Sequence, residues 1–221
     1  MAVPTDSLAE LPEDVSFEQA ATLPVAGLTA LYVLEKGGGL VGKRVLVTGA
    51  SGRVGLFALE LARLAGAWSV ALLRRGEHIG LVEEAGAHEV AVGEDAGVAS
   101  RLGPFDLIVE AVGGAVLGEV LGMLTPGGMC VAFGVSGGTE ATFDVRSFYF
   151  TGGASLYGFV LFHEVIAKPA SEGLGRLARL VAEGRLTPRI SIEDSWAGIG
   201  NVAQRLLDRG YQDKAVLRVE G

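Results

Sequence analysis

Three regularly spaced glycines mark the stretch of this chain whose chemistry is easiest to interpret. Gly49, Gly52 and Gly55 follow a β-branched run, residues 45–48, and overlap the start of an apolar-periodic segment, residues 53–65. With the alanine before Ser51, they give the pattern A-x-G-x-x-G. Small residues there permit a tight turn, let the backbone approach a pyrophosphate and let a helix pack on a strand. A helix N-terminus also offers free N–H groups to phosphates. The pattern predicts a dinucleotide site; the alternative is a strand-to-helix turn without a ligand.

The end of the next apolar run distinguishes between two dinucleotides. Residues 68–73 form that run, and Arg74 and Arg75 follow it, whereas Glu77 comes only after the expected turn. A site for NAD(H) favours an acid at the end of this strand, to accept from the ribose 2′-hydroxyl. A guanidinium can instead bind a 2′-phosphate in a bidentate manner, through two parallel hydrogen bonds. The two arginines therefore predict NADP(H); the alternative is a pair of solvated surface residues.

Composition limits the remaining classes of function. The chain has 221 residues, of which 49% are hydrophobic and 34 are glycine, and a net charge of −8. The acidic balance makes nucleic acid an unfavourable partner. The single cysteine, Cys130, cannot form an intramolecular disulfide, which favours a cytoplasmic protein. No signal peptide or apolar run of 18 residues is present, so no membrane association is predicted.

Strand-like and helix-like segments alternate along most of the chain. Ser16 is expected to cap a short helix, and Pro24 to open a second helix that runs to about Lys36. The expected strands are residues 2–3, 44–48, 68–73, 89–92, 105–110, 129–133, 153–160, 190–192 and 215–219. The expected helices after the second one are residues 53–65, 77–85, 114–124, 162–183 and 197–209. Strands that are apolar on both faces indicate an α/β fold, a Rossmann-type doubly wound parallel sheet with helices on both faces.

Several segments resemble one known superfamily in order and spacing. They are similar to the medium-chain dehydrogenases/reductases, and most closely to the zinc-independent quinone oxidoreductase (zeta-crystallin-like) branch. The segments are Leu11–Ala30, Val45–Gly55, Phe105–Gly114, Leu124–Gly128, Phe133–Gly134 and Asp213–Leu217. In that family a GroES-like domain precedes this region, and residues 2–11 look like its last strand. The resemblance implies that residues 1–36 are an interdomain segment with a remnant of that domain, and that residues 37–221 are an NADP(H)-binding Rossmann domain.

The resemblance also implies individual roles at the cofactor. Residues 51–54 match the pyrophosphate turn, Arg74 and Arg75 the 2′-phosphate region, and Thr29 a position near the nicotinamide, although Thr29 could equally be an ordinary helix residue. The loops after three later strands match the nicotinamide side. The full set of implied cofactor-binding residues is Thr29, Ser51, Gly52, Arg53, Val54, Arg74, Arg75, Val112, Gly113, Phe133, Gly134, Phe159 and Val160.

No catalytic side chain or metal ligand stands out in the sequence. A structural zinc site needs about four thiolates at short spacing, and the three histidines show no ligand spacing. Glu110, at the end of a strand, is expected to cap a turn or bind a ribose hydroxyl rather than act as a base. Hydride transfer needs few protein groups because the nicotinamide carries the reaction. We therefore expect an NADP(H)-dependent oxidoreductase of quinones or α,β-unsaturated carbonyl compounds, with this chain as its cofactor-binding part.

Two other functions remain compatible with the residues. One is an NADP(H)-binding module that senses or regulates without chemistry, and the other is a structural or partner-binding Rossmann domain with an empty site.

The segment from Thr151 to Phe162 has a composition that bears on assembly. It is uncharged, glycine-punctuated and β-prone, and the strand order 3-2-1-4-5-6 would place it at the sheet edge. Such an edge tends to pair with another strand unless it is covered. A homodimer through residues 151–162 is therefore expected, as the resemblance also implies; the alternative is an edge shielded by the chain's own loops.

Overall fold

The computed structural model describes residues 2–208 and 210–219, and the chain divides into two compact units. One unit comprises Thr29–Ile166, and the other comprises Met1–Leu28 together with Ala167–Gly221. Within the described residues, no helix combines the length and the apolar character needed to cross a membrane.

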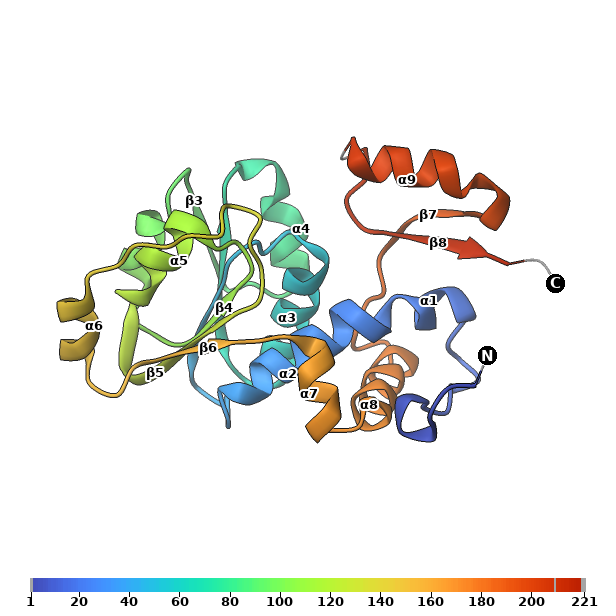
Figure 1. Ribbon diagram of the computed structural model, residues 1–221, viewed down its shortest axis with the longest axis horizontal. Helices are drawn as coiled ribbons and strands as arrows, with labels where there is room; N and C mark the ends of the chain where they lie inside the picture. The colour runs from blue at the N-terminus through green and yellow to red at the C-terminus, as the bar shows by residue number, and fades with distance from the viewer. Residues whose placement is uncertain (1, 209, 220–221) are drawn as a thin grey trace. The chain divides into compact units, whose positions relative to one another are not determined.

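The unit Thr29–Ile166 is built on a six-stranded parallel sheet in the order β3-β2-β1-β4-β5-β6 (Figure 1). Its strands are β1 (Arg44–Val47), β2 (Trp68–Leu73), β3 (Glu89–Val92), β4 (Phe105–Glu110), β5 (Leu124–Ala132) and β6 (Ser155–Gly158). Its helices are α2 (Leu28–Lys36), α3 (Arg53–Leu64), α4 (Ile79–Glu84), α5 (Gly114–Leu121), α6 (Val145–Thr151) and α7 (Leu161–Ala167). The predicted Rossmann-type doubly wound fold is confirmed, and the strand order reverses between β1 and β4.

Alternate residues of each central strand face opposite layers of helices. In β1, Leu46 belongs to a core that also contains Ile108 and Cys130, together with Val120 of α5 and Ala99 of the 3₁₀ segment Ala96–Leu102. The neighbouring residues of these strands face the layer that contains α2 and α3. Central strands that are buried on both faces explain the continuous apolar runs in the sequence.

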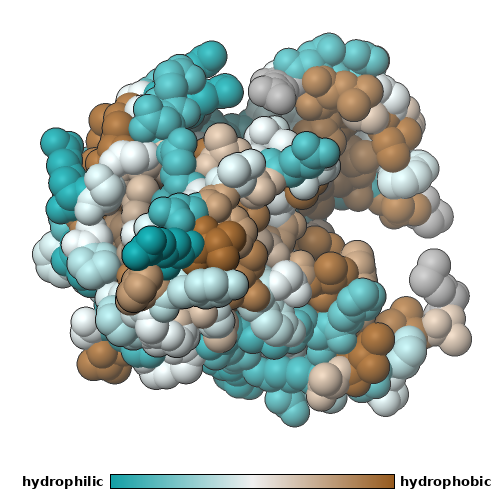
Figure 2. All heavy atoms as spheres, turned by 60° about the vertical axis from the view of Figure 1, so that its left-hand side comes forward, coloured by the Kyte–Doolittle hydropathy of each residue, from teal (hydrophilic) through white to brown (hydrophobic). Residues whose placement is uncertain are grey.

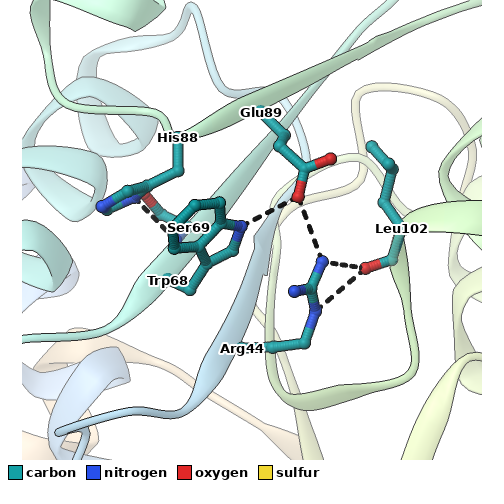
Figure 3. Close-up of polar contacts among 6 residues, drawn as sticks. All are labelled: Arg44, Trp68, Ser69, His88, Glu89 and Leu102. Carbon is teal, nitrogen blue, oxygen red and sulfur yellow. Dashed lines mark hydrogen bonds and ion pairs between the residues drawn. The ribbon is translucent and has the colours of Figure 1, made fainter.

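The amino ends of the first three strands are joined by a polar network (Figure 3). Glu89 Oε1 accepts from Trp68 Nε1 at 2.9 Å and lies 3.2 Å from Arg44 Nη2. The Trp68 ring stacks on His88 with 4.5 Å between ring centroids, and Arg44 also donates to the Leu102 carbonyl. This network ties the strands at the edge opposite the turns that carry the predicted cofactor residues.

The second unit holds α1 (Phe17–Ala21), α8 (Ala170–Ala182), β7 (Ile190–Ser195), α9 (Ile199–Leu207) and β8 (Lys214–Arg218). Ser16 caps α1 as predicted: its hydroxyl accepts from Gln19 N, and the Gln19 side chain accepts from Ser16 N. The predicted helix from Pro24 begins as a π-helical turn, Leu23–Gly27, before α2. The strands β7 and β8 pair in parallel in a small sheet of their own.

Several predicted elements differ from the structure. The single helix expected over residues 162–183 is wrong: α7 and α8 are separate helices, and Pro169 is the N-cap residue of α8. Proline has no N–H to continue the first helix and disfavours a helical conformation at the residue before it. The strand expected at residues 2–3 is absent, because no neighbouring strand pairs with it within the described residues.

Other differences concern element ends and one unpredicted helix. α6 has no apolar period that would reveal it, and Asp144 caps it by accepting from Arg146 N and Ser147 N. β5 begins at Leu124, before the glycine pair at residues 127–128, because a register shift lets it pair with β4 at both ends. The helix expected over 197–209 ends at Leu207; residues 1, 209, 220 and 221 lie outside the described residues. The division at residue 36 stays a prediction.

Candidate cofactor site

The predicted glycine turn joins β1 to α3 at the carboxyl edge of the sheet. Gly49 adopts φ +56°, a conformation that glycine tolerates best. At Gly55 a β-carbon would lie 2.6 Å from the carbonyl oxygens of both Gly49 and Ala50, so only glycine allows α3 to pack this close to the turn. The fold therefore favours glycine at both positions on steric grounds, independently of any ligand.

Gly52 has a different environment from the other two glycines. It is exposed, is the N-cap of α3 and adopts φ −79°; a β-carbon there would meet only the Gly49 carbonyl, at 3.1 Å. Gly52 has no side chain with which to cap α3, and the first turn of the helix contains no acidic residue. The first-turn N–H groups of a helix without a capping side chain can bind an anion. The exposed Gly52 and the acid-free first turn of α3 fit a dinucleotide pyrophosphate.

The turn after β4 adjoins the glycine turn across the position where the strand order reverses. A β-carbon at Gly49 would lie 3.4 Å from Ala111 Cβ, and the Thr48 hydroxyl accepts from Ala111 N at 2.9 Å. Gly113 follows with φ +73° and is the N-cap of α5. In doubly wound sheets, ligands bind outside the carboxyl ends of the strands at such a reversal.

Glu110 holds the backbone of this second turn. Its side chain is fully buried, and its Oε1 accepts from Val112 N at 2.8 Å, from Gly113 N at 2.9 Å and from the Thr48 hydroxyl at 3.2 Å. Burial raises the pKa of Glu110, and the three hydrogen bonds lower it by less. The expectation that Glu110 caps a turn is confirmed. With all three donors engaged inside the protein, its observed role is to shape the loop.

The loop after β5 packs on the same turn, and sequence analysis identified only part of this contact. At Gly134 a β-carbon would lie 2.0 Å from the Ala111 carbonyl oxygen, so glycine is required. Farther along, Gly137 N donates to the Val112 carbonyl at 2.7 Å, and Gly138 forms a β-bridge with Gly113. The contacts of Gly137 and Gly138 were not predicted, although the density of glycines after β5 was a signal for close backbone packing.

Two aromatic rings come together where β5 and β6 end. Phe133 and Phe159 pack edge to face with 6.4 Å between ring centroids, and Phe159 N donates to the Ala132 carbonyl at 2.8 Å. Phe159 is buried, whereas Val160 beside it is half exposed. The structure therefore brings the implied residues after β1, β4, β5 and β6 to one edge of the sheet.

The remaining implied residues lie at the margins of this edge. Arg74 and Arg75 directly follow β2, are exposed, and make no hydrogen bond or ion pair with another described residue. Thr29 is buried in the first turn of α2. Binding roles for all these residues stay predictions.

Comparison with known proteins assigns the chain to a family. Residues 54–174 match the family described as zinc-binding dehydrogenase. The chain belongs to this family. A chloroplast envelope quinone oxidoreductase homolog of Arabidopsis thaliana is 32% identical over 89% of this chain and 63% of its own length. The chain spans less than two thirds of the curated relatives that it matches first.

Solved structures of the family have the same fold. A mycobacterial quinone oxidoreductase superposes with a TM-score of 0.87 and 26% identity over 96% of this chain and 68% of that chain. A mycobacterial protein complexed with NADPH superposes with a TM-score of 0.81 and 26% identity, over 95% of this chain and 66% of that chain. The predicted resemblance to quinone-oxidoreductase-like medium-chain dehydrogenases/reductases is confirmed.

The family name implies zinc, and the described residues do not fit such a site. Among them, no three histidine, cysteine or acidic side chains gather closely enough to hold a metal ion. Cys130 is buried in β5, where loss of solvation raises the pKa of its thiol well above the usual range. Because zinc binds the thiolate, this environment disfavours ligation.

Proposed function

We propose that this chain binds NADP(H) and acts as the cofactor-binding part of an oxidoreductase that reduces quinones or α,β-unsaturated carbonyl compounds. The glycine turn at the strand-order reversal carries the proposal, because Gly52 is exposed there and the first turn of α3 contains no acidic residue. Family membership and the relatives named as quinone oxidoreductases support the type of reaction.

The preference for NADP(H) rests on the end of β2. Arg74 and Arg75 are exposed cations directly after Leu73, and neither is engaged with another described residue. A 2′-phosphate would accept charge-assisted hydrogen bonds from either guanidinium. The structure of a relative complexed with NADPH is consistent with this choice.

Hydride transfer in such a site depends mainly on how the protein positions the cofactor and the substrate. A bound nicotinamide supplies the hydride, and the protein orients it and excludes water. The turns after β4, β5 and β6 would form the surface on which the nicotinamide rests. The substrate is a small molecule, and no side chain of this chain is assigned a catalytic role.

The exposed apolar residues around β6 support a homodimer. Tyr149 and Phe150 on α6, Leu156 on β6, and Phe162 and Ile166 on α7 are all exposed. Figure 2 brings forward the side that carries α6 and shows hydrophobic side chains at its surface. Within the described residues, no strand pairs with the outer edge of β6. A two-fold axis at this edge would let each copy cover the other.

The cofactor assignment is tested by replacing the two arginines. We expect Arg74→Ala and Arg75→Ala each to cost about 1.5–3 kcal/mol of NADPH binding free energy, for the loss of a charge-assisted contact, and to change NADH binding little. Titration by nicotinamide fluorescence measures both. Arg101→Ala, which removes an exposed arginine from the 3₁₀ segment Ala96–Leu102, is the matched control. Equal weakening of NADPH and NADH would contradict the 2′-phosphate assignment.

Activity is tested separately from binding. Steady-state reduction of 1,2-naphthoquinone by NADPH with this chain would support the reductase. Binding without turnover would favour a regulatory module or the need for a further domain, and absence of binding would contradict the proposed function.

A further inference from the structure

Three side chains from distant parts of the sequence form one polar cluster beside the edge strand. Lys36 Nζ lies 3.1 Å from the Tyr157 hydroxyl and 2.7 Å from Glu164 Oε2, and the Tyr157 hydroxyl donates to Glu164 Oε1 at 2.5 Å. Lys36 Nζ also lies 4.3 Å from the centroid of the Tyr157 ring, within the range of a cation–π contact. The cluster joins α2, β6 and α7, which adjoin one another in Figure 1.

The charges in this cluster are mutually stabilised. The hydrogen bond to Glu164 raises the pKa of Lys36 against the opposing effect of burial. Burial by itself would raise the pKa of Glu164, but the hydrogen bonds from Lys36 and Tyr157 outweigh it, and the pKa is lowered. Lys36 and Glu164 are therefore held as an ion pair at neutral pH, and the Tyr157 hydroxyl is hydrogen-bonded to both.

The cluster encloses the short connection between β6 and α7. Tyr157 precedes the connection and Glu164 follows it, and their side chains bond directly. Within the connection, the Val160 carbonyl accepts from His163 N at 2.9 Å and from Glu164 N at 3.2 Å. α7 has only seven residues, a length at which a helix depends on outside contacts. Lys36 thus fixes both ends of the segment from which Phe159 and Val160 project.

We propose that Lys36, Tyr157 and Glu164 are positioning residues, which hold Phe159 and Val160 against the nicotinamide half of the cofactor without contacting it. The inference rests on the proposed function. Phe159 already packs edge to face on Phe133 at the carboxyl edge of the sheet. A small shift of its backbone would move one wall of the proposed nicotinamide site. The proposed pyrophosphate and 2′-phosphate contacts, in the turns that follow β1 and β2, would be unaffected.

The test compares NADPH with 2′,5′-ADP, which has the adenosine and both phosphates but no nicotinamide. Tyr157→Phe removes only the hydroxyl, and Lys36→Met removes the charge and retains a linear apolar side chain. We expect each variant to bind NADPH about three- to tenfold more weakly, as for the loss of one or two hydrogen bonds that hold the site. Affinity for 2′,5′-ADP should be unchanged in calorimetric titration. A purely structural role would weaken both ligands or neither, and would overturn the inference.

A control at the opposite edge of the sheet tests whether the weaker NADPH binding depends on the location of the altered ion pair. Glu89→Gln weakens a comparable partly buried ion pair, between Arg44 and Glu89, in the network of Figure 3. It should leave both affinities unchanged, and a Glu89→Gln effect equal to that of Tyr157→Phe would also overturn the inference.

Failure of the inference can be distinguished from failure of the proposed function. If the unmodified chain binds neither NADPH nor 2′,5′-ADP, the proposed function fails and the inference fails with it. If the unmodified chain binds both ligands and the variants do not discriminate between them, only the inference fails.

Discussion

At the scale of single residues, the three glycines of the turn have separable roles. Gly55 is required by packing, because its neighbours leave no room for a β-carbon, and Gly49 by its positive φ. Gly52 has neither constraint to the same degree. A residue that the fold alone does not demand is a candidate for a role in binding.

This difference gives a paired prediction. Gly52→Val should abolish binding of both NADPH and NADH while far-UV circular dichroism stays native-like, because its side chain would occupy the space proposed for the pyrophosphate. Gly55→Ala should instead lower the free energy of unfolding by about 1–3 kcal/mol, since it overpacks the contact between α3 and the turn. Urea denaturation and fluorescence titration measure the two effects. Normal cofactor binding by Gly52→Val would contradict the assignment of the pyrophosphate site to this turn.

At the scale of elements, the contacts of short helices decide where they lie. α7 follows β6 closely and ends before Pro169, so it is tied to the sheet through Glu164 rather than through a long apolar face. The side chains of Lys36 and Glu164 are 27% and 16% exposed, so their ion pair is shielded enough to contribute to stability.

This ion pair predicts a defined pH dependence. Because the folded-state pKa of Glu164 is lowered, its contribution is present above its ordinary pKa of about 4.5 and is lost as the pH falls through the lowered value. Glu164→Gln should therefore reduce the free energy of unfolding at pH 7 by about 1 kcal/mol, and the difference from the unmodified chain should shrink below pH 4.5. Urea denaturation at several pH values measures it. A difference that is constant with pH would show that charge plays no part.

At the scale of the whole molecule, the edge of the sheet limits how chains assemble. The exposed apolar side chains of α6, β6 and α7 adjoin a strand edge without a partner strand among the described residues. Exposed apolar patches of this kind often mark interfaces between proteins.

The proposed homodimer is tested at Leu156, which is 44% exposed in β6. Leu156→Lys should shift the protein toward monomer, because two copies of the charge would approach each other across the two-fold axis. Light scattering at micromolar concentration gives the mass. Val41→Lys, at an exposed position before β1, is the control and should not change it. A monomeric mass for the unmodified chain would contradict the dimer.

The sequence by itself determined the features that depend on neighbouring residues. The glycine turn, the cap at Ser16 and the alternation of strands and helices follow from local sterics and apolar periods, and the structure confirms them. The break at Pro169 was also encoded locally, but the long amphipathic pattern obscured it.

Only the tertiary structure decided which distant segments meet. Lys36 and Tyr157 are 121 positions apart, and no local pattern relates them. The contacts of Gly137 and Gly138 with the turn after β4 likewise depend on where β5 ends. A turn is fixed by the conformational preferences of its own few residues, whereas such contacts exist only once the sheet has folded and brought separate turns to the same edge.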